Sequence, residues 1–145
     1  VVDSRQGAPR LRVEVADRLK DKTNKPGDWD NAIRLDLSER ELCLVICVLL
    51  GWMKTTGDQK FHGQGKDKGF SLEHQGRHAF LRAWHKGGAK SVQLDPESST
   101  RAAILALSVY CRRMGLVNCD GVCDFVGAQS IIRNVFLKMS VDNGN

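Results

Sequence analysis

Aromatic and cationic side chains alternate in the segment HAFLRAWHK, residues 78–86. Side chains of a β-strand point alternately to opposite faces, so the pattern predicts two different faces. One face carries His78, Phe80, Arg82, Trp84 and Lys86. Aromatic rings stack on the bases of single-stranded nucleic acid, and cations neutralise its phosphates. The other face carries Ala79, Leu81 and Ala83, and an alternative remains that Phe80 and Trp84 instead fill the core, where large aromatic residues usually lie.

Further cations flank this segment and extend the candidate surface. They are Arg77, Lys90, Lys66 and Lys68. Residues 55–68 are rich in Gly and Lys, which predicts a mobile basic loop that could touch phosphates or simply be solvated. The Gly63-Gln-Gly65 stretch lacks the spacing of a phosphate-binding loop.

The chain offers no arrangement typical of an enzyme or a metal site. The histidines are His62, His74, His78 and His85. Nothing in their spacing predicts convergent ligands with a second shell of partners. The pair Cys119 and Cys123 has no second pair at the distance of a zinc finger. We therefore expect no catalysis, no metal and no cofactor.

The five cysteines and the apolar runs suggest a compartment. An odd number excludes complete pairing within the chain, and Cys43, Cys47 and Cys111 fall in apolar helical patterns. These features favour an intracellular, reducing compartment. The longest apolar run, residues 42–53, is shorter than the roughly 20 residues of a bilayer span, and no signal peptide is recognisable.

Composition favours one folded domain with an anionic partner. The 145 residues are 41% hydrophobic, carry a formal net charge of +5 and have a pI of about 9.1. A chain of this length and apolar content can bury a real core. We expect a loose arm over residues 1–9, a binding domain over 10–116 and a helical extension over 117–145.

Three runs of alternating apolar and polar residues, followed by one helix, must position the basic face. Strands are predicted around Phe70–Leu72, His78–Lys86 and Val92–Leu94, separated by turns at Gln75-Gly76 and Gly87-Gly88. Asp95 before Pro96 predicts a helix start, and Gly115 predicts its end.

The first half repeats this order of elements. Alternating runs at residues 11–15 and 33–37 predict two strands, and Ser38 with Glu41 predicts a capping box that starts a helix over about 39–54. This helix is apolar nearly all round, so we expect it, or residues 102–109, to bury part of its surface at a subunit interface. A last helix is expected after Asp124, followed by a frayed tail over 141–145.

The segments IRLDLSE and VQLDPES, each leading into a long apolar helix, suggest an internal strand–helix repeat. Together with the basic strands GFSLEH and RHAFLRAWHK and the end SVQLDPESSTRAAILALSVYCRRM, the chain resembles the Whirly proteins and the related positive transcriptional coactivators over residues 10–115. Kinetoplastid guide-RNA-binding proteins share that fold. The resemblance implies an α+β fold, with antiparallel sheets packed against long helices, that binds single-stranded nucleic acid as a homodimer or tetramer.

We therefore expect a single-stranded DNA-binding protein of low sequence specificity that acts in replication, repair, recombination or transcription. Two alternatives stay open: an RNA-binding relative of the same fold, and a non-catalytic protein-interaction scaffold.

Overall fold

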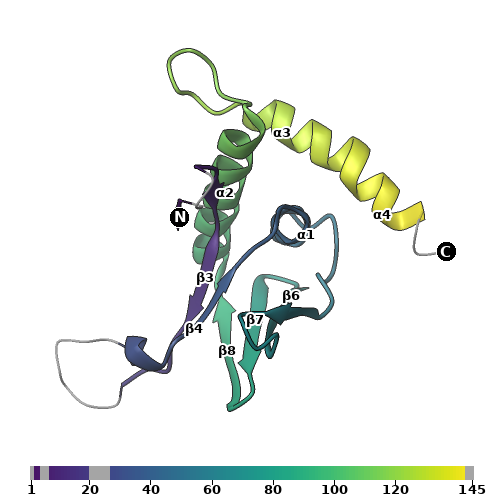
Figure 1. The fold of residues 1–145 in the computed structure, drawn as a ribbon. Coiled ribbons are helices and arrows are strands. Elements are labelled where there is room, and N and C mark those ends of the chain that lie inside the picture. Colours follow the sequence, from purple (N-terminus) through teal and green to yellow (C-terminus); the bar gives the residue numbers. More distant parts are fainter. Residues whose placement is uncertain (1, 4–6, 20–26, 143–145) are drawn as a thin grey trace.

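A computed structural model describes residues 2–3, 7–19 and 27–142. In this part the chain is α+β, with antiparallel sheets and helices on one side of the largest sheet (Figure 1). The predicted α+β class is confirmed at this level. Among the described residues, no helix is long and apolar enough to cross a bilayer.

The largest sheet has the strand order β5-β6-β7-β8. Its strands are β5 (Gln59–His62), β6 (Lys68–Gln75), β7 (His78–His85) and β8 (Gly88–Leu94). Gly76 adopts a φ of 61° in the β6–β7 turn, where a residue with a Cβ would be strained. The three strands predicted around residues 70, 80 and 92 are therefore confirmed.

Burial separates the two faces of this sheet. Phe70, Leu72, Ala79 and Ala83 are buried against the helices. Arg82 is exposed on the opposite face, and Phe80 and Trp84 are only half-buried there. We call this opposite side the outer face.

The predicted mobile loop over residues 55–68 instead contains β5, which pairs with the edge of β6. Thr56 holds the segment before β5 against β6. Its backbone N–H donates to Leu72 O at 2.9 Å, and its Oγ1 accepts from Leu72 N at 2.9 Å. β5 shows no apolar alternation because it lies at the sheet edge, so the sequence pattern did not predict it.

Two short ladders precede the sheet. β1 (Val2–Asp3) pairs with β2 (Pro9–Arg10), so part of the arm expected over residues 1–9 forms a ladder, while residues 1 and 4–6 lie outside the described part. β3 (Arg12–Val15) and β4 (Ile33–Asp36) confirm the two strands that the alternating runs predicted, and the structure pairs them antiparallel. The 3₁₀ turn η1 (Trp29–Asn31) precedes β4.

Helix α1 (Glu39–Leu49) begins with the predicted capping box, in which Ser38 Oγ accepts from Glu41 N and the Glu41 carboxylate accepts from Ser38 N. It ends before the expected residue 54, because Gly51 turns the chain with a φ of 74°. Residues 41–48 are all buried, and α1 packs against β6, α2 and the C-terminal helical segment. The apolar sides of α1 are therefore covered within one chain, and of the two expected subunit contacts only that through residues 102–109 stays a prediction.

Helix α2 (Pro96–Met114) follows β8 directly. Asp95 accepts from Ser98 N at its start, and Gly115 ends it with a φ of 70°, as predicted. Arg112 and Arg113 occupy its last turn, where their positive charges interact favourably with the negative end of the helix dipole.

The C-terminal extension is a helical arm that leads away from α2 (Figure 1). It comprises α3 (Phe125–Ile131), the π-helical segment η2 (Ile132–Leu137) and α4 (Lys138–Asp142). Asp124 caps it by accepting from Gly127 N at 2.9 Å, as predicted. Ala128 and Ile132 are buried. Of the tail expected over 141–145, residues 143–145 lie outside the described part.

Candidate nucleic-acid interface

Trp84 lies across the outer face on a glycine. The β6–β7 register places Trp84 directly opposite Gly69. A Cβ added at Gly69 would be 2.4 Å from Trp84 Cζ2 and 2.4 Å from Gln59 O, far closer than van der Waals contact. Only glycine therefore lets the indole rest on the backbone of β6. One face of the ring is covered by the sheet, which holds the side chain in place.

Arg82 lies over this indole. Its guanidinium carbon is 5.4 Å from the centroid of the Trp84 ring, which is within cation–π range. Arg82 is exposed, and within the described residues it makes no ion pair with an acidic side chain. Its charge is therefore free to meet an external anion.

A hollow of about 450 Å³ lies next to Arg82 and Trp84. Its lining comes from Asp58, Lys60, Arg82, Trp84, His85, Lys86, Gly88 and Ala89. Three cations and one carboxylate give it a net positive charge. An aromatic ring within a positively charged hollow suits the stacking of a base whose phosphate is neutralised nearby.

The structure brings together Arg82, Trp84 and Lys86 of the predicted site residues, with Phe80 half-buried next along the same strand face. Arg77 and His78 lie at the other end of β7, where they line a separate hollow of about 320 Å³ beside α2.

The predicted lysines outside β7 are placed differently. Lys90 lies opposite Ala83, a residue of the buried face, and its Nζ is 2.7 Å from the Asp17 carboxylate. Its side chain is only 11% exposed, so this cation is already paired and stands apart from the outer face. Lys66 is exposed in the β5–β6 turn, whereas Lys68 is half-buried.

Two exposed residues of β5 were not predicted, and one of them, Lys60, extends the candidate surface. Lys60 lines the hollow, and Phe61 is 74% exposed. Phe61 also has a φ of 70° where the β5–β6 register shifts, a left-handed conformation that is costly for a residue with a Cβ. An exposed aromatic held in a strained backbone points to a role outside the fold. The sequence signal was the lone aromatic in a basic, Gly-rich segment.

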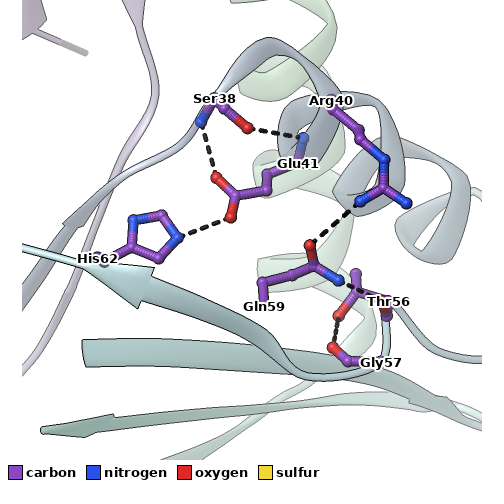
Figure 2. A network of polar contacts seen from close by, with 7 residues as sticks. All are labelled: Ser38, Arg40, Glu41, Thr56, Gly57, Gln59 and His62. Atoms are coloured by element: carbon purple, nitrogen blue, oxygen red, sulfur yellow. Dashed lines mark hydrogen bonds and ion pairs between the residues drawn. The ribbon is translucent and has the colours of Figure 1, made fainter. Parts of the chain in front are cut away.

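A polar network fixes β5 to the start of α1 (Figure 2). His62 Nε2 lies 2.7 Å from Glu41 Oε1, while Glu41 Oε2 accepts from Ser38 N at 2.8 Å. Gln59 Nε2 donates to Thr56 O at 2.7 Å, and Arg40 reaches Gln59 Oε1 at 3.5 Å. The neighbours of Lys60 and Phe61 are thus anchored, which holds both residues on the edge strand of the sheet.

The two buried cysteines of α1 are not activated thiols. Burial raises the pKa of the Cys43 thiol to about 12 and that of Cys47 to about 11, so neither is a ready nucleophile. Within the described part of the chain, no group of three or more His, Cys, Asp or Glu residues is arranged to hold a metal ion.

No protein-family model matches the chain, and neither the curated proteins nor the solved structures compared with it give a significant match.

Proposed function

We propose that this protein binds single-stranded DNA on the outer face of the β5–β8 sheet, with little sequence specificity. The observation that carries the proposal is the Arg82–Trp84 pair, seated on Gly69 and open to a basic hollow. One base stacks on the solvent side of the Arg82–Trp84 pair, and the cations Arg82, Lys60 and Lys86 neutralise the neighbouring phosphates. Binding through ring faces and phosphates accepts every base, so sequence preference is weak.

The proposed fold type is Whirly-like, built on the repeated strand–helix order. β4 leads into α1 and β8 leads into α2, and each strand belongs to an antiparallel ladder. The protein acts without a cofactor or metal, in an intracellular, reducing compartment, and serves replication, repair, recombination or transcription.

A homodimer or tetramer is part of the proposal, formed through α2 rather than α1. Ile104 and Leu105 are 50% and 44% exposed on α2. Leu105 also borders an apolar hollow of about 170 Å³ between α2, α1, β3 and the inner face of the sheet. The same apolar surface supports the alternative of a protein-interaction scaffold.

Equilibrium binding of a fluorescent oligonucleotide tests the proposal. Trp84→Ala should weaken single-stranded DNA binding about 5- to 150-fold, equivalent to the roughly 1–3 kcal/mol of one stacked base. Arg82→Ala should weaken binding. It should also reduce the slope of the log binding constant against log salt concentration by about 0.7, the value for one phosphate contact to a single strand.

Two matched variants serve as controls. Trp29→Ala removes an exposed tryptophan outside the sheet, and Arg133→Ala removes the cation of a second pair, 5.6 Å from the Trp52 ring. Both should bind like the wild type. Equal losses in the control and test variants would reject the outer face as the binding surface. Affinities for single-stranded RNA and duplex DNA of equal length, compared with that for single-stranded DNA, decide between the DNA-binding and RNA-binding alternatives.

A further inference from the structure

Two cysteines meet where α2 gives way to the C-terminal arm. Cys111 lies in the last turns of α2, is fully buried, and directs its Sγ to Asp124 O at 3.5 Å. Cys123 immediately precedes Asp124 and is half-buried. Burial is the largest cause of the raised pKa of Cys111, and electrostatic interaction with the Cys123 thiol raises it further.

The chain between them is held in a compact loop. Leu116 N donates to Cys111 O at 2.8 Å, and Asp124 N donates to Leu116 O at 2.9 Å. Val117 forms a bridge with Cys123, and the Asn118 side chain accepts from Asp120 N and Val122 N. Hydrogen bonds within this loop therefore hold Cys123 close to the end of α2.

We propose that Cys111 and Cys123 form a reversible disulfide when the protein meets a low-molecular-weight disulfide such as oxidised glutathione. Cys123 is the entry point because it is partly exposed, whereas Cys111 is shielded. The Cys123 thiolate attacks one sulfur of the oxidant, and its disulfide bond breaks to release one glutathione. Cys111, after losing its proton, then attacks the Cys123 sulfur and releases the second glutathione.

Two protein thiols are thereby oxidised to one disulfide, and one glutathione disulfide is reduced to two thiols, which take up the two protons. The pKa of Cys111 is raised to about 11, so the closing step should accelerate with rising pH over the neutral range. The new bond closes a loop that contains the Gly115 helix end. It ties the residue before the Asp124 N-cap of α3 to α2, and this fixes the origin of the arm.

Peptide mapping of the full chain tests the site. The protein is incubated with oxidised glutathione, free thiols are blocked by alkylation, and the chain is cut with trypsin and with a protease that cleaves before Asp. Trypsin separates Cys111 from Cys119 and Cys123, and cleavage before Asp120 separates Cys119 from Cys123. The expected product is a Cys111–Cys123 cross-link that dithiothreitol removes.

Variants assign the partner without disturbing the buried thiol. Cys119→Ser should keep the cross-link, and Cys123→Ser should abolish it. Oxidation should raise the melting temperature of the wild type and of Cys119→Ser by several degrees, because a cross-link restricts the unfolded chain, and should leave Cys123→Ser unchanged. A Cys119–Cys123 link, a link between chains, or stable glutathione adducts without a Cys111 link would each overturn the proposal. The readout does not involve nucleic acid, so it stands or falls separately from the proposed function.

Discussion

Gly69→Ala probes the seat of the indole most directly. The new methyl carbon would begin 2.4 Å from both Trp84 Cζ2 and Gln59 O, so the ring and the edge strand β5 must both yield. Forcing extra volume into a packed site typically costs about 1–3 kcal/mol. Because two contacts are violated, we expect a loss of about 2 kcal/mol in the free energy of unfolding.

The double variant separates the two contacts. In the Trp84→Ala background the clash with the ring is absent and only the clash with Gln59 O remains. Gly69→Ala should then cost about 1 kcal/mol less than in the wild type, a coupling within the usual range for residues in contact. Urea unfolding followed by far-ultraviolet circular dichroism measures all four proteins, since removing one of three tryptophans would alter fluorescence.

Gly57→Ala supplies the control for this cycle. Gly57 has a φ of 64° and no atom within 4 Å of an added Cβ, so its substitution strains the backbone without touching Trp84. Its effect should add to that of Trp84→Ala within about 0.5 kcal/mol. If Gly69→Ala were equally additive, the indole would not rest on Gly69 in solution, and the preformed stacking surface would be lost with it.

The remaining predictions concern other parts of the chain. Phe61→Gly should leave the melting temperature unchanged or raise it, because glycine tolerates the left-handed backbone at φ 70°, while single-stranded DNA affinity falls; a drop in stability with unchanged affinity would show that Phe61 serves the fold. Ser38→Ala removes the capping box of α1 and should cost about 1 kcal/mol in urea unfolding, against no change for the exposed Ser91→Ala. The hydrogen bond from Arg12 lowers the pKa of Asp36, so this pair stabilises the fold above the ordinary Asp pKa and loses that contribution as pH falls through the lowered value. Asp36→Asn should therefore reduce stability at pH 7, by at most about 1 kcal/mol for so exposed a pair, and have no such effect near pH 2. With Ellman's reagent, the exposed Cys119 should react fastest in the native protein, and Cys43 and Cys47 only after unfolding.

Local patterns determined the elements that depend on neighbours in the sequence. The strands β6 to β8 followed from alternation between Gly-containing turns, and the helices α1 and α2 began at the predicted caps, Ser38 and Asp95. These signals act over a few residues, because caps and turns satisfy backbone groups locally. The alternation in β7 also separated Arg82 and Trp84 from the buried Ala79 and Ala83.

Tertiary structure decided what depends on residues distant in the chain. β5 is a strand because β6 offers it a partner, and no periodic pattern within Gln59–His62 predicts that pairing. Lys90 faces Asp17 because β8 adds to the sheet in a particular register, and α1 needs no partner subunit because β6, α2 and the C-terminal arm cover it. The seat of Trp84 on Gly69 likewise exists only once β6 and β7 pair. Register and packing across the sheet are non-local, so a sequence pattern shows which side chains share a face but not what lies against them.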